Sequence, residues 1–223
     1  TTWGLSSMDN HWLMTTFIIA NGGRIIDFSQ SPPKFVMDEP KSLQALEVYN
    51  RMLNIDKTIL IRPMGGNWQL NPQAFANGQV GMMRIEQWVI EYVRDLMMEN
   101  GSEEDYGLTY FPQGPGADGF VDETFGGNIY FIPASSDNER AKAALLVYDA
   151  LFEMHDPSIS FEESTRNIAE SLFNDEESVE VYVDIIVNRR SVSNGVSKVN
   201  LREGIMELTG YIIDQMGTPQ SII

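Results

Sequence analysis

The sequence predicts an α/β fold, because short apolar strands alternate with helical patterns up to about residue 155. The clearest unit is residues 79–85, an apolar strand that delivers Trp88 to the start of a helical pattern. Open α/β folds place ligand sites at the carboxyl ends of such strands. At 223 residues the chain is long enough for one large domain, or for one domain with a helical extension. We therefore expect a ligand site near Trp88.

The amino-terminal part is expected to hold a strand, a helix and a hairpin arm. Residues 1–7 are predicted to be the strand, and Asp9 or Asn10 is predicted to cap the helix that follows. The glycine pair at 22–23 ends this helix, because glycine tolerates the left-handed backbone of a helix end. Residues 24–28 then form a short strand or hairpin arm.

A second helix is predicted to start at Asp38, with Pro40 in the first turn, where proline is tolerated. Its core face carries apolar side chains every three to four residues: Leu43, Leu46, Tyr49 and Leu53. Residues 57–72 are rich in Pro, Gly and Asn, which is typical of an irregular surface loop. Long loops in compact domains are more often functional than idle, so Trp68 is a candidate for the binding site.

The middle of the chain is predicted to continue the α/β pattern. Residues 106–111 alternate as a strand, residues 112–119 form a loop, and residues 128–132 form a third apolar strand. Ser136 and Glu139 fit a capping box for the next helix. The buried face of that helix is expected to consist of Ala141, Ala144, Leu145, Tyr148 and Leu151 or Phe152.

The carboxyl-terminal part is predicted to be helical, at about 161–173, 176–188 and 200–216. The last helix has the clearest spacing, with apolar residues at Leu201, Ile205, Leu208, Ile212 and Met216. Gly217, with Pro219 two residues later, is expected to end it.

Composition excludes several classes of function. Acidic residues outnumber basic ones by 32 to 15, for a formal net charge of −17, so nucleic acid would be repelled and is not an expected partner. The absence of cysteine excludes disulfides, thiolate catalysis and cysteine-bound zinc. No apolar run approaches the roughly 20 residues that a membrane span requires, and no signal peptide begins the chain.

Neither a metal nor another cofactor is expected. The two histidines, His11 and His155, are far apart in the sequence, and no acidic residues follow a calcium-loop pattern. No Gly-x-Ser-x-Gly elbow marks a serine nucleophile. The glycine pairs at 22–23, 65–66 and 126–127 lack the lysine or third glycine of phosphate-binding loops.

A carbohydrate-active hydrolase is one alternative, because the acidic pairs Asp122-Glu123 and Glu162-Glu163 could supply carboxyl groups. Glycoside hydrolysis needs two carboxyl groups held several ångströms apart across one sugar. Adjacent residues point to opposite faces of a strand and diverge by about 100° on a helix, so neither pair faces one sugar by itself. Solvated acidic surface is the better interpretation. A plain interaction or scaffold domain is the second alternative.

Tryptophan makes the positive case for carbohydrate. A sugar ring exposes an apolar face of C–H bonds that matches a flat indole, while polar neighbours satisfy its hydroxyl groups. The chain has four tryptophans: Trp3, Trp12, Trp68 and Trp88. Trp12 and Trp88 both fall at the ends of predicted elements, where a side chain is available to a ligand.

Motifs spread over about residues 1–155 share one resemblance. They are Trp3-Gly-Leu-Ser6, Ala20-Asn-Gly-Gly-Arg-Ile-Ile-Asp27, Phe75-Ala-Asn-Gly78 with Trp88, Asp105-Tyr-Gly-Leu-Thr-Tyr-Phe-Pro112, Gly126-Gly127 and Pro133-Ala-Ser-Ser136. Together they resemble the extracellular solute-binding proteins of ATP-driven (ABC) importers, specifically the carbohydrate-binding group, family 1. Residues 156–223 match that family poorly in detail.

The resemblance implies a lobe of the type II periplasmic-binding-protein-like fold, a small mixed sheet flanked by helices. Residues 1–155 would be the α/β solute-binding lobe, and residues 156–223 a helical portion packed on the same domain. The chain would correspond to the carboxyl-terminal lobe with some linked helices. We expect it to bind sugar weakly or not at all without the other lobe. Residues 128–152 are expected either to belong to that other lobe or to dock differently without it.

The resemblance also implies a non-catalytic receptor for a sugar or oligosaccharide, which docks on ABC transporter permease subunits. Trp12 and Trp88 match positions of stacking aromatic residues, and Gly126 with Gly127 matches a glycine pair on the cleft floor. Asp9 near Trp12 would add a polar contact. Glu86 departs from the small residues usual in the family, so it would either accept bonds from sugar hydroxyls or narrow the pocket. The protein would be extracellular or periplasmic, with any lipid anchor outside this chain.

Overall fold

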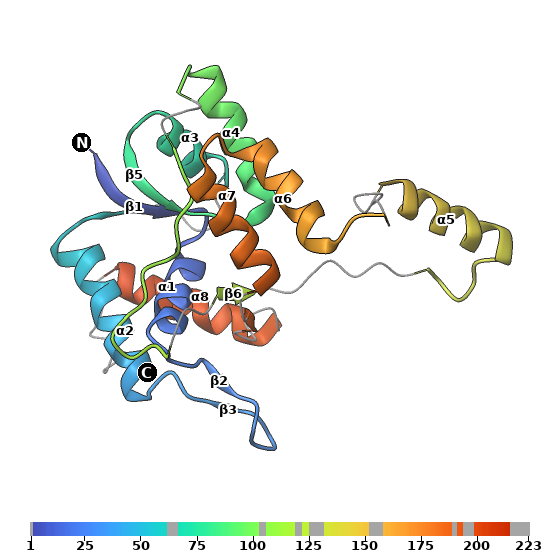
Figure 1. Ribbon diagram of the computed structural model, residues 1–223. Helices are drawn as coiled ribbons and strands as arrows, with labels where there is room; N and C mark the ends of the chain where they lie inside the picture. Colours follow the sequence, from blue (N-terminus) through green and yellow to red (C-terminus); the bar gives the residue numbers. More distant parts are fainter. Residues whose placement is uncertain are drawn as a thin grey trace.

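The computed structural model describes residues 2–61, 67–102, 106–118, 122–124, 132–151, 158–188, 191–193 and 199–214. These residues form a small parallel sheet with helices packed around it, and one helix, α5 (Asn138–Leu151), stands apart (Figure 1). The fold is mixed α/β, as the alternation of strands and helices predicts. None of the described helices is long and apolar enough to cross a membrane.

The central sheet has three parallel strands, β1 (Trp3–Ser7), β4 (Ile59–Leu60) and β5 (Val80–Arg84). β1 lies in the middle and pairs with both neighbours, and Ser7 on β1 lies opposite Arg84 on β5. Because all three strands run in the same direction, their carboxyl ends meet at one edge of the sheet.

The strands predicted at 1–7 and 79–85 are confirmed. The predicted irregular loop at 57–72 is wrong in part, because it contains β4 and the start of α3 (Leu70–Ala76). A strand of two residues is too short to show alternation, and Pro72 lies in the first turn of α3, where proline is compatible with a helix.

The larger hydrophobic core packs helices against the sheet. These are α1 (Asn10–Ala20), α2 (Pro40–Asn50) with its π-helical continuation η1 (Arg51–Ile55), and α8 (Val199–Ile213). Their fully buried side chains include Leu13, Met14, Leu46, Tyr49, Ile205 and Ile212. The three helices that apolar spacing predicts here are confirmed, although Glu39 rather than Asp38 occupies the N-cap position of α2. Pro40 explains this shift, since the residue before a proline is held in extended backbone.

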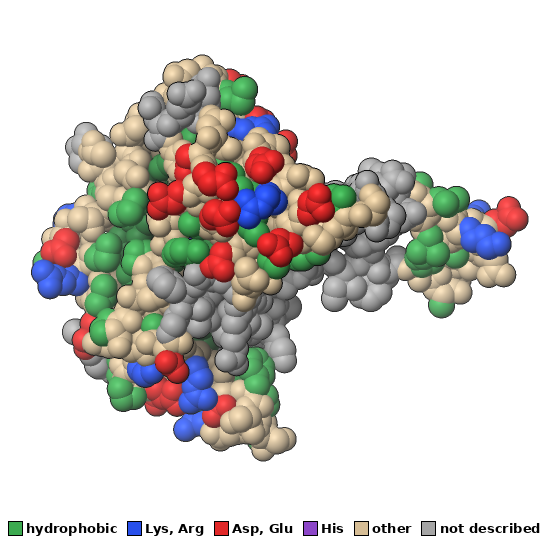
Figure 2. Space-filling view, in the orientation of Figure 1, with side chains coloured by type: hydrophobic (Ala, Val, Ile, Leu, Met, Phe, Trp, Pro, Cys, Tyr) green, Lys and Arg blue, Asp and Glu red, His purple; other side chains and the backbone are tan. Residues whose placement is uncertain are grey.

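A second group of helices covers β5. It consists of α3, the 3-10 turn η2 (Gln87–Val89), α4 (Ile90–Glu99), α6 (Phe161–Leu172), and α7 (Glu176–Val183) with its π-helical continuation η3 (Asp184–Asn188). Their buried residues include Val89, Val93, Met97, Phe173 and Tyr182. The helices predicted at 161–173 and 176–188 are confirmed. Acidic side chains gather on the exposed face of α6 and α7 (Figure 2).

Two short strand pairs complete the described secondary structure. β2 (Ile26–Asp27) and β3 (Lys34–Phe35) form an antiparallel hairpin that extends from the lower part of the molecule in Figure 1, in agreement with the hairpin arm predicted at 24–28. β6 (Asp122–Thr124) pairs in parallel with β7 (Ser191–Ser193).

Residues 106–118, here called the strap, run in extended form from α7 to the end of α1 (Figure 1). The strand predicted at 106–111 is wrong, because no residue of the strap joins a strand ladder. Its amides bond elsewhere: Leu108 N donates to the Ser178 hydroxyl at 2.7 Å, and Gly114 N donates to Ala20 O at 2.9 Å. Of the strand predicted at 128–132, all but Ile132 lies outside the described residues.

Helix α5 projects from the body of the molecule, and apolar side chains cover much of its surface (Figures 1 and 2). Leu145, Leu146 and Val147 are 57–70% exposed. The expectation that Ala144 and Leu145 are buried is therefore wrong, because no element of the described part of the chain covers them. The predicted capping box is also wrong, since Asp137 rather than Ser136 accepts the capping bond, from Arg140 N at 2.8 Å. The side chains of Tyr148, Leu151 and Phe152 lie outside the described set.

Candidate ligand-binding site

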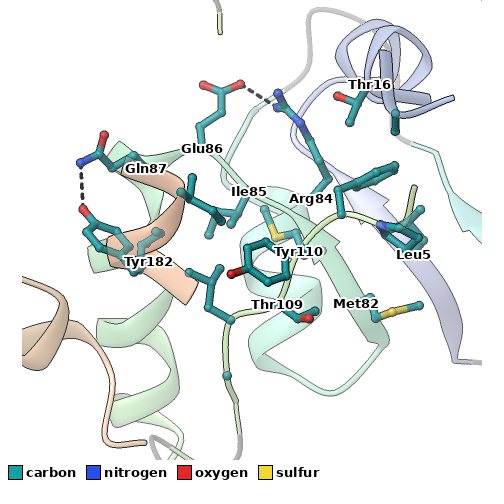
Figure 3. Close-up of a pocket in the computed structure, with 18 of the residues that line it drawn as sticks. Leu5, Thr16, Met82, Arg84, Ile85, Glu86, Gln87, Thr109, Tyr110 and Tyr182 are labelled. Atoms are coloured by element: carbon teal, nitrogen blue, oxygen red, sulfur yellow. Dashed lines mark hydrogen bonds and ion pairs between the residues drawn. The ribbon is translucent and has the colours of Figure 1, made fainter. Parts of the chain in front are cut away.

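A groove of about 1740 Å³ runs along the sheet between β5 and the strap (Figure 3). Its lining includes Leu5 and Met82 on the sheet, Phe17 and Val48 from α1 and α2, and Tyr110 from the strap. Most of these side chains are apolar, as in typical small-molecule sites. The described lining has two basic residues and two acidic ones, so the groove is close to neutral although the chain carries −17.

Glu86 and Trp88 lie at one end of this groove, just beyond the carboxyl end of β5. Both oxygens of the Glu86 carboxylate are engaged. Oε2 accepts a hydrogen bond from Trp88 Nε1 at 2.7 Å. Oε1 accepts one from an Arg84 guanidinium nitrogen at 3.0 Å (Figure 3). The Arg84 and Glu86 side chains are only 9% and 19% exposed, whereas Trp88 is 60% exposed. An indole is thus presented to solvent from a partly buried ion pair.

Trp68 joins this site from the segment before α3. Its ring meets the Trp88 ring with centroids 5.1 Å apart and planes inclined by 62°. It also meets the Tyr92 ring on α4 at the same centroid distance and inclination. Edge-to-face contacts of this kind stabilise aromatic pairs by about 0.5–1.5 kcal/mol beyond their burial. The three rings therefore form one aromatic cluster, of which Trp88 is the member among the described lining of the groove.

Polar groups on α7 border the groove opposite β5. Gln87 Nε2 donates to the Tyr182 hydroxyl at 2.8 Å, and the Tyr110 hydroxyl donates to Asp184 Oδ2 at 2.8 Å. Burial raises the pKa of Tyr182, and the hydrogen bond from Gln87 opposes that rise. Tyr182 therefore stays a neutral hydroxyl that links α7 to the turn carrying Trp88.

Trp12 and Asp9 lie at the same edge of the sheet but not in the groove. Asp9 is the N-cap residue of α1, two residues after β1 ends. Trp12 is half-buried, packs against the larger core, and has its ring centroid 4.4 Å from that of His11. Neither residue is among the described lining of the groove. Gly126 and Gly127, predicted as the cleft floor, lie outside the described residues.

The sequence does not single out Arg84, Tyr92 or Tyr182 as members of this cluster. For two of them, the sequence spacing from a predicted site residue agrees with their place in the cluster. Arg84 precedes Glu86 by two residues, the spacing that places side chains on one side of an extended chain, and Tyr92 follows Trp88 by one helical turn. Tyr182 has no such spacing, because its contact with Gln87 spans 95 residues.

The arrangement suits binding by stacking and hydrogen bonding. Among the described residues, no group of three or more His, Asp or Glu side chains could hold a metal ion. Glu162 and Glu163 are exposed in the first turn of α6, where acidic residues favour the helix dipole, and Glu163 N donates to the capping hydroxyl of Ser160 at 3.1 Å. The side chains of Asp122 and Glu123 lie outside the described set.

Comparison with known proteins identifies the fold. No protein-family model and no curated protein matches this sequence. Several solved structures match 99% of the chain, among them the following three. They are the GacH receptor of Streptomyces glaucescens GLA.O, solved unliganded and with acarbose (18% identity, TM-score 0.64), an ABC transporter solute-binding protein from Thermotoga lettingae TMO bound with α-D-tagatose (14%, 0.62), and a cyclo/maltodextrin-binding protein complexed with maltotetraose (12%, 0.59).

These matches show the type II periplasmic-binding-protein-like fold, which confirms the fold implied by the sequence resemblance. The chain covers 56%, 57% and 56% of the three solved chains, so it spans little more than half of their length.

Proposed function

We propose that this chain belongs to the solute-binding component of an ABC transporter and that it binds an uncharged sugar or oligosaccharide at the carboxyl edge of its sheet. The observation that carries the proposal is the exposed Trp88 indole, held beside the Glu86 carboxylate and the Gln87 amide at the end of β5. In open α/β folds this edge is where ligands bind.

The chemistry of the cluster fits a neutral carbohydrate. An exposed indole face matches the C–H face of a sugar ring, and Gln87 and Tyr182, which line the same groove as Trp88, carry polar groups suited to sugar hydroxyls. The described groove lining has balanced charges, while the whole chain is strongly acidic. A polyanionic ligand would therefore be repelled on approach and would find no excess of basic side chains in the groove.

Asp9, Trp12, Gly126 and Gly127 remain predicted members of the same site. The pairing of Ser7 with Arg84 supports the first two, because Asp9 and Glu86 each follow these paired residues by two positions. Parallel strands in register bring such positions to the same edge of the sheet.

The rest of the site is proposed to come from a second lobe. The solved structures extend well beyond the part that this chain matches, and α5 presents apolar side chains that no described element covers. Under this proposal residues 1–155 belong to the solute-binding lobe, residues 156–223 are a helical portion of it, and α5 packs on the second lobe. Closure of two lobes on a solute is a population shift driven by better contacts in the closed state.

Transport rather than catalysis is the proposed role, with permease subunits as partners and an extracellular or periplasmic location. The solved neighbours are described as a receptor and as binding proteins, which supports this assignment. Two permease genes beside the coding gene would support it further.

The test is a titration of the ¹⁵N-labelled chain with maltotetraose, acarbose and D-tagatose, observed at the four tryptophan indole N–H signals. This measurement detects millimolar binding, which is what one wall of a site should give. We expect the Trp88 and Trp68 signals to move on titration and the Trp3 signal to stay in place. Trp88→Ala should remove the response of Trp68.

Two outcomes would contradict the proposal. One is a panel of neutral mono- and oligosaccharides that leaves Trp88 and Trp68 unchanged at millimolar concentration, both with this chain and with a protein that also carries the second lobe. The other is release of product from aryl glycosides in proportion to the amount of protein, since a receptor does not turn over its ligand.

A further inference from the structure

We propose that Glu86 is a positioning residue, whose carboxylate holds the Trp88 indole in one orientation and so presents its ring to the ligand as a fixed surface. This inference rests on the proposed function, since it concerns the same site. It assigns Glu86 a role that acts through Trp88, in place of a direct hydrogen bond to a sugar hydroxyl.

The geometry of the carboxylate carries the inference. Oε2 lies 2.7 Å from Trp88 Nε1, a short bond for a neutral N–H donor, and Oε1 lies 3.0 Å from Arg84. Arg84 thereby holds the carboxylate while the carboxylate holds the indole. Each oxygen keeps a second lone pair, so these two bonds orient the indole but do not by themselves exclude a ligand hydroxyl, and experiment has to separate positioning from direct contact.

The contrast in exposure explains why the indole needs this support. Trp88 is 60% exposed, so packing covers less than half of the side chain. Trp68 contacts the ring from one side at 62°, which limits its motion without setting it completely. A charge-assisted hydrogen bond from the ring nitrogen supplies the missing restraint.

The backbone brings these three residues together. Arg84 is the last residue of β5 and Glu86 is still extended (φ −103°, ψ 146°), so their side chains lie on the same side of the chain. The chain then tightens into η2, where Val89 N donates to Glu86 O at 2.9 Å. This turn folds the Trp88 ring back toward the Glu86 carboxylate. A strand end followed by a 3-10 turn is thus the local structure that the arrangement requires.

The expected loss of affinity when the Trp88 ring is no longer held follows from the number of rotamers open to tryptophan. Three staggered wells are open to χ1 and about two orientations to χ2. A released ring that visits between three and six of these states occupies the binding-competent one roughly a third to a sixth of the time. The apparent dissociation constant then rises about three- to sixfold, because only the competent fraction binds.

The primary test needs no ligand. The ¹⁵N{¹H} nuclear Overhauser effect of the Trp88 indole nitrogen measures how ordered the ring is on the nanosecond timescale, and Trp88→Phe assigns the signal. We expect Glu86→Ala to lower this value clearly and Glu86→Gln, which keeps an acceptor oxygen, to restore part of it. Glu91→Ala is the matched control, because it removes a nearby groove-lining carboxylate that is 72% exposed and pairs with Arg94.

A double-mutant cycle then separates positioning from direct contact. Phenylalanine at position 88 keeps an aromatic face but has no N–H to donate. If Glu86 acts through the indole, Glu86→Ala weakens maltotetraose binding three- to sixfold in the wild-type background and has no further effect beside Trp88→Phe. The remaining indole signals report whether each variant is folded.

A Trp88 ring that is as ordered in Glu86→Ala as in the wild type would overturn the inference. So would an equal loss of binding on Glu86→Ala with Trp88 and with Phe at position 88, which is the result for direct contact. If neither this chain nor a protein that also carries the second lobe binds any of the sugars, the function proposed above is wrong, yet the ring-order measurement still decides the role of Glu86.

Discussion

Glycines make the contact where the strap crosses the end of α1. A β-carbon on Gly116 would overlap the Asn21 carbonyl oxygen, and one on Gly114 would overlap the Asn21 side chain. Asn21 in turn donates from Nδ2 to Lys41 O at 2.8 Å and accepts from Gly116 N at 3.2 Å. The strap therefore lies closer to α1 than any residue with a side chain allows.

We expect Gly116→Ala to lower the free energy of unfolding by about 1–3 kcal/mol, because the backbone must shift to admit the methyl group. Gly204→Ala on α8 is the control. Nothing lies within 4 Å of its β-carbon position, and alanine favours a helix over glycine by roughly 0.5–1 kcal/mol, so this variant should gain stability. Urea denaturation measures both changes. A Gly116→Ala variant as stable as the wild type would show that the strap does not need this close approach.

At the level of single residues, some positions are predictable from the sequence and others are not. The sequence predicts Trp68, Glu86 and Trp88 near one site, and the structure places them in one cluster. The N-cap predicted at Asp9 for α1 is found there, whereas those of α2 and α5 are displaced by one residue, to Glu39, which precedes Pro40, and to Asp137, whose carboxylate accepts from Arg140 N. Trp12 is predicted at the site on the same grounds as Trp88, namely its place at the end of a predicted element and the family resemblance, yet it is partly buried against the core. Sequence spacing does not encode which face of a helix the rest of the chain covers.

At the scale of elements, the start of α7 is joined to the strap. Asp175 is the N-cap residue and accepts from Ser178 N at 2.8 Å, while the Ser178 hydroxyl accepts from Leu108 N at 2.7 Å. Hydrogen bonds from Ser178 hold the pKa of Asp175 below its ordinary value of 3.8. The Asp175 carboxylate thus caps the start of α7 and also anchors Ser178, whose hydroxyl binds the strap at Leu108.

Asp175→Ala should lower the free energy of unfolding by about 1 kcal/mol near neutral pH, the usual loss on removing a cap. Because the folded pKa is lowered, the ionised carboxylate stabilises the fold above the unfolded-state pKa of about 3.9. The contribution of the ionised carboxylate to the difference in the free energy of unfolding between wild type and Asp175→Ala should shrink as the pH falls through the folded pKa of Asp175. Asp175→Asn keeps a capping oxygen without titrating, so it should lose less stability and show no such pH dependence.

Urea midpoints measured from neutral pH down to about pH 3, just below the unfolded-state pKa, would test this expectation. A wild-type advantage over Asp175→Ala that stays constant across the range would rule out the ionised cap as its source.

Elements with long, regular spacing are predictable from this sequence. The buried positions of α2 and α8 recur every three or four residues, and their helices are found where expected. The strap is not predictable, because alternating residues at 106–111 suggest a strand while the actual partners of its amides are a side chain and a helix end. Whether an extended segment joins a ladder depends on distant parts of the chain.

At the scale of the whole molecule, none of the three hydrophobic clusters found among the described residues includes a residue of α5. Leu146 on α5 is 70% exposed, whereas Ile205 on α8 is 1% exposed. Leu145 and Leu146 on α5 therefore contribute little to the stability of the described body.

We expect Leu146→Ala to change the free energy of unfolding by less than about 0.5 kcal/mol, because the side chain is already in water. Ile205→Ala should cost about 2–5 kcal/mol, since it leaves a cavity in the larger core. Thermal or urea unfolding of the two variants compares them directly. A large loss on Leu146→Ala would contradict this reading and show that α5 packs on the body in solution.

The overall architecture was within reach of the sequence, since its motifs imply the fold that the solved structures share. The position of α5 was not, because an amphipathic pattern predicts that a face is buried but does not name the surface that buries it.

The rings of Trp68 and Trp88 stand 5.1 Å apart at 62° to one another. Two like chromophores so close and so oblique share their excited states, so their absorption bands split into components with circular dichroism of opposite sign. The pair thereby gives the protein an optical signature of its own, which disappears when either ring turns. Loss of the fixed ring geometry, as expected in Glu86→Ala, can therefore be followed by light alone, without a dye or a label.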